Sequence, residues 1–140
     1  MFVQPYLFFN GRCEEAVTFY EAALGAKLLF KMRYNESPEP PQPGMVPAGF
    51  EDKIMHCSFK VGSTTIMASD GCTPRESEFK GFNLSIGVAT EADAERIFNA
   101  LAEGGNPYMP LTKTFWSPKF GMLADKFGIN WMVSLDTTPE

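Results

Sequence analysis

The sequence predicts an α+β protein built from two βαβββ modules, each with the order strand, helix, strand, strand, strand. The same order of hydrophobic patterns occurs in both halves of the chain. Gly62 and Gly128 are separated by as many residues as Asp70 and Asp136, which indicates an internal repeat. A chain of 140 residues suits one ordinary domain or two small repeats sharing a core. We expect a single domain, 1–140, made of repeats at about 1–71 and 79–138.

In the first half, strands are predicted at residues 3–9, 28–34, 53–61 and 64–69, and a helix at 13–24. The helix follows from apolar residues at helical spacing after Asn10-Gly11, and Gly25 stands where a C-cap glycine would end it. The last two strands form a hairpin that turns at Gly62-Ser63.

The second half repeats this order, with strands at 82–88, 108–111, 120–125 and 130–135 and a helix at 90–103. Thr90 with Asp93 three residues later resembles a capping box, and Gly104-Gly105 ends the helix. The last two strands form a hairpin around Lys126-Phe127-Gly128. The first module differs by a loop at 37–50, which contains five prolines and is either a lid over a pocket or a surface insertion.

Composition and charge exclude several classes of function. The net charge is −5 and basic residues do not cluster, which argues against nucleic acid or an anionic membrane as a partner. No apolar run could cross a bilayer, and the N-terminus lacks a signal-peptide pattern. The three cysteines, Cys13, Cys57 and Cys72, form no CxxC motif and indicate reduced thiols in a cytoplasmic protein. The single histidine, His56, excludes paired-histidine metal centres.

Three segments carry a family signature: YLFFNGRCEEAVTFYEAALGA, DKIMHCSFKVGSTTIMASD and MPLTKTFWSPKFGMLADKFGINW. Together they resemble the PhnB-like branch of the glyoxalase/bleomycin-resistance superfamily, also called the vicinal oxygen chelate superfamily. The resemblance covers essentially the whole chain. It implies a curved mixed sheet around a central cleft, helices on the outer faces, and a homodimer. It is weak evidence of function, because one fold hosts many activities.

Strand alternation predicts which side chains face that cleft. In the strand from Lys53, one face is apolar and packs under a helix (Met55, Cys57, Phe59, Val61), while Ile54, His56, Ser58 and Lys60 lie on the other. The predicted cleft residues are aromatic, thioether or neutral polar: Gln4, Tyr6, Phe8, His56, Ser58, Asn83, Ser85, Trp116, Met122, Met132 and Ser134. This set suits a small, partly apolar or aromatic ligand.

Metal-dependent relatives, as the resemblance implies, use a His or Gln on each first strand and a Glu on each last strand. The first-strand positions are Gln4 and Asn83, and counting from the hairpin glycines puts the glutamate positions at Ile66 and Met132. Two neutral amide oxygens are too few for a stable divalent site. We therefore expect no metal and no other cofactor, with a non-standard metal site as the alternative.

His56 is the weak candidate for a catalytic residue. It is either a ligand-binding group or general base, or a structural histidine hydrogen-bonded to a Ser or Tyr. Alternation excludes a Cys57–His56 dyad, because adjacent strand residues point to opposite faces. Cys13 begins a helix, where a thiol pKa can be lowered. Phe115, Trp116 and Tyr108 form either an aromatic clamp or packing contacts.

Three functions compete. The carboxylate-poor cleft favours a metal-independent small-molecule binding protein. The alternative is a superfamily enzyme, an isomerase, lyase or dioxygenase, that uses His56 or a non-standard metal site. A methyltransferase label has been attached to related sequences, but no glycine-rich turn opens a parallel nucleotide-binding sheet here. Partner binding through the proline-rich loop is a further alternative.

Overall fold

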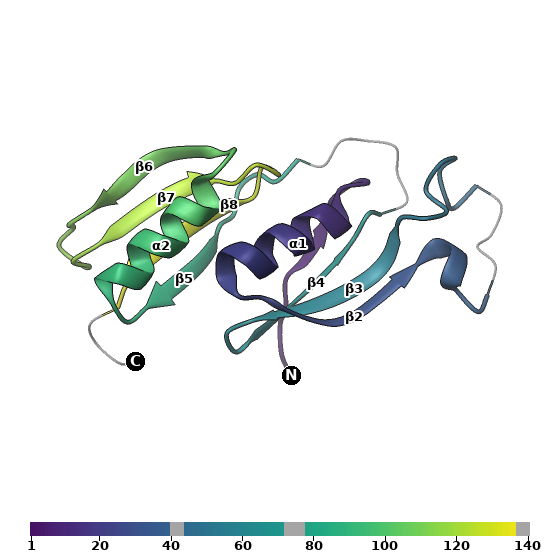
Figure 1. Ribbon diagram of the computed structural model, residues 1–140, viewed down its shortest axis with the longest axis horizontal. Helices are drawn as coiled ribbons and strands as arrows, with labels where there is room; N and C mark the ends of the chain where they lie inside the picture. The colour runs from purple at the N-terminus through teal and green to yellow at the C-terminus, as the bar shows by residue number, and fades with distance from the viewer. Residues whose placement is uncertain (40–43, 72–77, 137–140) are drawn as a thin grey trace. The chain divides into compact units, whose positions relative to one another are not determined.

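The computed structural model describes residues 1–39, 44–71 and 78–136. The chain divides into two compact units, Met1–Ser77 and Glu78–Glu140. In the described residues, each unit has one α-helix and a four-stranded mixed sheet (Figure 1), and the first unit also has a short 3-10 helix. The predicted α+β fold of two βαβββ modules is therefore confirmed. The grouping of the units into one domain stays a prediction.

The first unit contains β1 (Tyr6–Phe8), α1 (Cys13–Leu24), β2 (Lys27–Arg33), the short 3-10 helix η1 (Tyr34–Glu36), β3 (Ile54–Val61) and β4 (Thr64–Ser69). Its strands lie in the order β1-β4-β3-β2. The β1–β4 pair is parallel and the other pairs are antiparallel. The helix α1 crosses one face of this sheet (Figure 1).

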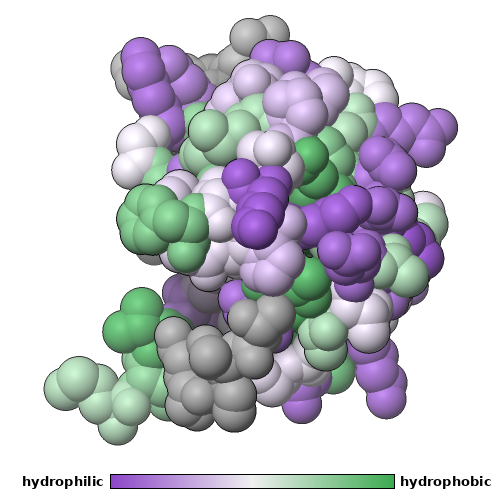
Figure 2. Space-filling view, turned by 90° about the vertical axis from the view of Figure 1, so that its left-hand side faces the viewer, coloured by the Kyte–Doolittle hydropathy of each residue, from purple (hydrophilic) through white to green (hydrophobic). Residues whose placement is uncertain are grey.

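The second unit contains β5 (Leu84–Val88), α2 (Glu91–Ala102), β6 (Asn106–Thr112), β7 (Phe120–Ala124) and β8 (Asn130–Leu135). Its strand order, β5-β8-β7-β6, repeats that of the first unit, and β5–β8 is again the parallel pair. At the edge, β6 is exposed along almost its whole length. Figure 2, which views the molecule from the side of this unit, shows hydrophilic and hydrophobic side chains interspersed.

The core of each unit lies between its helix and one face of its sheet. In the first unit the ring of Tyr20 on α1 stacks on Phe59 of β3 with centroids 5.9 Å apart, and both side chains are fully buried. In the second unit Phe98 and Leu101 of α2 are buried together with Leu123, Trp131 and Val133 of β7 and β8. Burial of each large apolar side chain contributes about 1.5–3 kcal/mol. These contacts leave the opposite face of each sheet, called here the open face, without a helix from its own unit.

The predicted helix ends are confirmed. Gly25 adopts the left-handed conformation at the C-cap of α1, with φ of 66°. The Thr90 side chain accepts a hydrogen bond from the backbone N–H of Asp93 at the start of α2. None of the helices in the described ranges is long and apolar enough to span a membrane.

The face prediction for β3 is correct for Cys57 and Phe59, which are buried, and wrong for Ile54. Ile54 is 1% exposed and packs on the helix side, because the β2–β3 register shifts between Met32 and Arg33. The irregularity inserts one residue and so breaks the simple alternation. The first strand is also shorter than predicted: β1 covers Tyr6–Phe8, and Val3, which precedes it, is solvent-exposed. In the proline-rich loop, residues 40–43 lie outside the described ranges.

Candidate functional site

The open face of the first sheet carries a row of side chains that crosses all four strands. Tyr6 of β1 pairs with Met67 of β4, Met67 pairs with Ser58 of β3, and Ser58 pairs with Phe30 of β2. Directly paired residues lie on the same face of a sheet at neighbouring positions. Tyr6 is 37% exposed and Phe30 is 45% exposed, so the row ends in two accessible aromatic rings.

His56 lies beside this row and contacts both aromatic ends. Its Nδ1 is 3.0 Å from the Tyr6 hydroxyl oxygen, with which it shares a hydrogen bond. The imidazole centroid is 5.5 Å from the Tyr6 ring and 6.0 Å from the Phe30 ring. Phe8 extends the aromatic group, with its centroid 5.0 Å from that of Tyr6. These contacts form a half-exposed aromatic surface with one hydrogen-bonded imidazole at its centre.

The open face of the second sheet has the equivalent row with different chemistry. Ser85 of β5 pairs with Met132 of β8, Met132 pairs with Met122 of β7, and Met122 pairs with Met109 of β6. Three thioethers thus stand where the first sheet has Met67, Ser58 and Phe30. Methionine side chains are flexible and polarisable, and they adapt to irregular apolar ligands.

Aromatic residues border the methionine row. Trp116 packs edge-on against Phe120 with centroids 5.3 Å apart, and the Phe115 ring lies 4.8 Å from Trp116. Phe115 is 97% exposed. The Tyr108 hydroxyl donates a 3.3 Å hydrogen bond to the Asn130 side-chain oxygen.

Most of the predicted cleft residues lie on the open faces of the sheets of their own units. In the first unit these are Tyr6, His56 and Ser58, with Phe8 against Tyr6; in the second they are Ser85, Met122, Met132 and Ser134, with Trp116 at the end of the row. Gln4 and Asn83 lie just outside β1 and β5. The side-chain oxygen of Asn83 is buried and has no hydrogen-bond partner among the described residues.

Sequence reasoning missed Phe30, Met67 and Met109. Alternation alone could not have placed Phe30, because the β2–β3 register shifts between Leu28 and Phe30 and only the pairing shows Phe30 opposite Ser58. The Gly62-Ser63 turn pairs Val61 with Thr64 and so sets Met67 opposite Ser58. Met109 could not be placed in this way, because the β6–β7 register is irregular on both sides of it.

The predicted glutamate-equivalent position in the first module was wrong. Ile66 is buried on the helix side, and Met67 is the residue that matches Met132, because each pairs with the first strand of its unit. Counting four residues past each hairpin glycine does not give equivalent positions, because the two connections differ in length. Two residues separate the paired ends of β3 and β4, whereas five separate those of β7 and β8. The four positions that correspond to the metal ligands of the metal-dependent relatives are then Gln4, Met67, Asn83 and Met132. Two amides and two thioethers do not fit a hard divalent cation, and the described residues contain no cluster of three or more His, Cys, Asp or Glu side chains suited to a metal.

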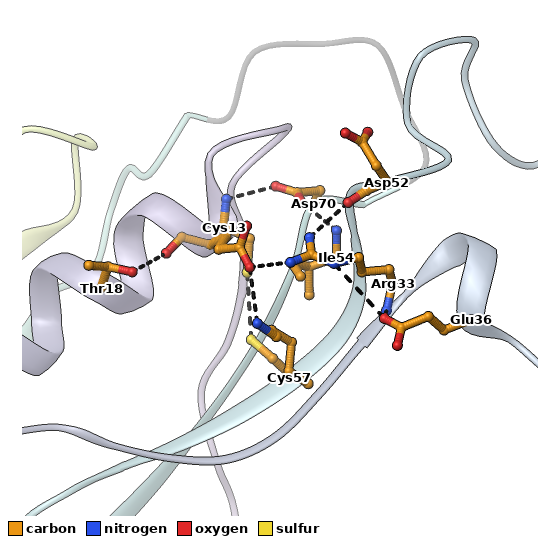
Figure 3. A network of polar contacts seen from close by, with 10 residues as sticks. Cys13, Thr18, Arg33, Glu36, Asp52, Ile54, Cys57 and Asp70 are labelled. Atoms are coloured by element: carbon orange, nitrogen blue, oxygen red, sulfur yellow. Dashed lines mark hydrogen bonds and ion pairs between the residues drawn. The ribbon is translucent and has the colours of Figure 1, made fainter.

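The two described cysteines form a buried pair on the helix side of the first sheet (Figure 3). Cys13 Sγ lies 3.6 Å from Cys57 Sγ. The pKa of Cys13 is raised, contrary to the prediction, because the hydrogen bond to Cys57 and burial favour its neutral form and the Asp70 carboxylate adds to this. The pKa of Cys57 is lowered by the same hydrogen bond. Cys57 and His56 point to opposite faces, as predicted; Cys72 lies outside the described residues.

Comparison with known proteins places the chain in a family. Residues 2–134 match the family described as 3-demethylubiquinone-9 3-methyltransferase. The chain belongs to this family. Protein YjdN of Escherichia coli (strain K12) is 33% identical over 138 residues, which is 95% of this chain and 94% of YjdN. The similarity to YjdN thus extends over nearly the whole length of both chains.

Solved structures agree with this assignment. Protein PA1353 from Pseudomonas aeruginosa is 45% identical, with a TM-score of 0.84 over 97% of this chain and 98% of its own. A putative 3-demethylubiquinone-9 3-methyltransferase, PhnB protein, from Bacillus cereus is 26% identical, with a TM-score of 0.80 over 97% of this chain and 100% of its own. The predicted PhnB-like kinship is therefore confirmed.

The glyoxalase-like fold is also confirmed by more distant structures. A glyoxylase/bleomycin resistance protein/dioxygenase domain from Frankia sp. EAN1pec has a TM-score of 0.64 at 14% identity, covering 96% of each chain. A glyoxalase-related enzyme from Fulvimarina pelagi has a TM-score of 0.63 at 16% identity, over 97% of this chain and 88% of its own. At such identities the likeness concerns the fold alone.

The family's name implies S-adenosylmethionine, and we tested whether the residues present fit that cofactor. The turn from β1 to α1 is the place where a nucleotide-binding fold holds anionic ligand groups on backbone N–H donors. Here Asp70 Oδ1 already accepts the N–H groups of Gly11, at 2.7 Å, and Cys13, at 2.8 Å. Within the described residues, each sheet has one parallel strand pair. The β1–α1 turn therefore does not fit a nucleotide-type cofactor site.

Proposed function

We propose that the protein is a metal-independent binding protein for a small, partly apolar or aromatic molecule. The observation that carries the proposal is the row Tyr6–Met67–Ser58–Phe30 with His56 beside it on the open face of the first sheet. Half-exposed aromatic rings that gather on one face are typical of a binding surface. His56, Tyr6 and Ser58 add a few polar groups that would orient the ligand. The methionine row of the second unit supplies a second apolar surface.

An aromatic-compound screen by thermal shift tests this proposal, with affinities of the hits measured by isothermal titration calorimetry. Phe30→Ala should weaken binding at least about tenfold, equivalent to about 1.4 kcal/mol, because it removes one end of the aromatic row. Leu29→Ala is the matched control, since Leu29 is 50% exposed and falls at the irregularity of β2, unpaired with β3. Equal loss in both variants, or no saturable hit, would contradict the proposal.

A second candidate function is acid–base catalysis at His56, and the Tyr6–His56 hydrogen bond favours it. A hydroxyl on Nδ1 fixes the orientation of the imidazole, as a catalytic histidine requires. Each compound that binds should be followed by NMR for conversion. Conversion by the wild type that His56→Gln abolishes would establish an enzyme, whereas unchanged ligands support the binding protein.

We further propose that the protein binds no metal, is located in the cytoplasm and forms a homodimer. Elemental analysis and a thermal-shift series with Zn²⁺, Ni²⁺, Mn²⁺ and Fe²⁺ should show no stoichiometric metal and no ion that stabilises by several degrees. The free thiols of Cys13 and Cys57 support a cytoplasmic location. Light scattering is expected to give the mass of a homodimer, and a monomer at all concentrations would contradict that part.

A further inference from the structure

A small cavity lies between α1 and the sheet of the first unit, on the side opposite His56. Its volume is about 160 Å³, and both Cys13 and Cys57 line it. Apolar side chains, including Val17, Leu28 and Ile54, form part of its wall, and charged side chains (Glu14, Glu21 and Lys31) also line it. The cavity is large enough to admit a molecule the size of hydrogen peroxide.

We propose that Cys13 and Cys57 are a peroxide-reactive dithiol that forms an intramolecular disulfide. In the first step the Cys57 thiolate attacks one oxygen of hydrogen peroxide and breaks the O–O bond, which gives Cys57 sulfenic acid and hydroxide. In the second step the Cys13 sulfur attacks the sulfenic sulfur: the S–S bond forms, the sulfenic S–O bond breaks, and the departing hydroxide takes the Cys13 proton to become water. The proton that Cys57 lost on forming its thiolate converts the hydroxide of the first step into the other water. Two thiols and one peroxide thus give one disulfide and two waters.

The proximity of the thiols supports this reaction. Their sulfur atoms are 3.6 Å apart, so bond formation to about 2.05 Å needs an approach of about 1.5 Å. One carboxylate anchors the backbone at both sides: Asp70 Oδ1 accepts the N–H of Cys13, and Asp70 Oδ2 accepts the N–H of Ile54, three residues before Cys57 (Figure 3). The two cysteines are therefore held facing each other by a fixed network.

The roles of the two thiols follow from their surroundings. The hydrogen bond from Cys13 lowers the pKa of Cys57, while burial and Asp70 oppose this. The ammonium group of Lys31, which pairs with Cys57 across β2 and β3, adds a smaller lowering. Cys13, whose pKa is raised, stays protonated and resolves the sulfenic acid. The attacking residue is thus Cys57, since the thiolate is the nucleophile.

The test uses the Cys72→Ser variant, which keeps only the proposed pair. The protein is treated with hydrogen peroxide, alkylated after denaturation, digested and analysed by mass spectrometry. We expect a Cys13–Cys57 crosslinked peptide, a mass lower by two hydrogen atoms per chain, and return of both thiols after dithiothreitol. Two thiols still alkylated, a crosslink between chains, or stable sulfinic acid at either cysteine would overturn the proposal.

Two single variants in the same background assign the roles. With Cys13→Ser, whose hydroxyl can still donate a hydrogen bond to the Cys57 sulfur, peroxide should leave a Cys57 sulfenic acid that dimedone traps. With Cys57→Ala, the Cys13 thiol should react at least about tenfold more slowly, because burial and the Asp70 and Glu14 carboxylates still raise its pKa. Equal reaction of Cys13 would contradict the assignment of the nucleophile. The crosslink measurement on the Cys72→Ser protein decides the main proposal even if a core variant fails to fold.

Discussion

The buried carboxylate of Asp70 accepts a 2.8 Å hydrogen bond from the backbone N–H of Cys13, the first residue of α1. It also accepts the N–H of Gly11 on the same oxygen and that of Ile54 on the other. Arg12, at the N-cap position, makes no side-chain capping bond. A residue distant in sequence therefore supplies the cap of α1 and ties it to the start of β3.

Asp70→Asn should destabilise the protein by about 3 kcal/mol, because an amide group would turn N–H toward a buried N–H donor. Urea unfolding followed by far-UV circular dichroism measures the change. Asp136→Asn is the matched control, since Asp136 has the repeat-related position but is exposed, and we expect a change within about 0.5 kcal/mol. Equal costs at both positions would show that Asp70 is not the special anchor inferred from its contacts.

The sequence was sufficient to predict the order of elements and the open-face residues of the strands that alternate regularly. Met132 and Ser134 in β8 have the predicted half-buried pattern between buried Trp131, Val133 and Leu135. In contrast, Ile54 was misplaced by one register irregularity, and Ile66 by the unequal lengths of two hairpin loops. Such local insertions change no hydrophobic pattern, so only the strand pairing reveals them.

Contacts between segments that are distant in the sequence could not be predicted from the sequence either. Cys13 and Cys57 are 44 positions apart, and their approach depends on how α1 crosses the sheet. The sequence left open whether a Ser or a Tyr is the hydrogen-bond partner of His56. The parallel pairing of β1 with β4 brings Tyr6 beside it. The raised pKa of Cys13 likewise depends on Cys57, burial and Asp70, which outweigh the helix-terminus effect expected from sequence.

Gly105→Ala should destabilise the second unit by about 3 kcal/mol, because an added Cβ would lie 2.2 Å from the backbone oxygen of Ala124. Backbone at this close approach cannot rotate away. Gly87→Ala is the matched control: its Cβ would meet only the carboxylate tip of Asp136, which can move. Thermal unfolding should separate the two variants by several degrees, and similar melting temperatures would contradict the crowding argument.

Glu14 links α1 to β2 through Lys31, at 3.1 Å, and Arg33, at 2.5 Å. The hydrogen bond from Arg33, then that from Lys31, lowers the pKa of Glu14. A lowered folded-state pKa stabilises the protein above the unfolded value of 4.5, and the contribution is lost as pH falls through the folded value. Glu14→Gln should thus cost less than about 1 kcal/mol at pH 7, because the pair is half-exposed and screened.

Urea unfolding of the wild type and Glu14→Gln at a series of pH values measures this contribution. The difference between the two proteins should shrink below pH 4.5, and at high salt it should shrink at neutral pH too. Glu15→Gln serves as the control, because Glu15 pairs with Arg12, three residues away at the exposed start of α1. A difference that grows on acidification would have the wrong sign for a carboxylate with a lowered pKa.

The Tyr6–His56 pair distinguishes a ligand-binding histidine from a structural one. Tyr6→Phe keeps the ring and removes only the hydroxyl, so its effect on stability should stay within about 1 kcal/mol at this exposed hydrogen bond. If the pair orients a ligand, Tyr6→Phe and His56→Ala each weaken binding several-fold, and the double variant loses less than the sum because both disrupt one contact. Calorimetric titration of all four proteins with the best aromatic hit gives the coupling. Unchanged affinity in His56→Ala, together with lowered stability, would assign His56 to the structure of the sheet and leave the aromatic row as the binding surface.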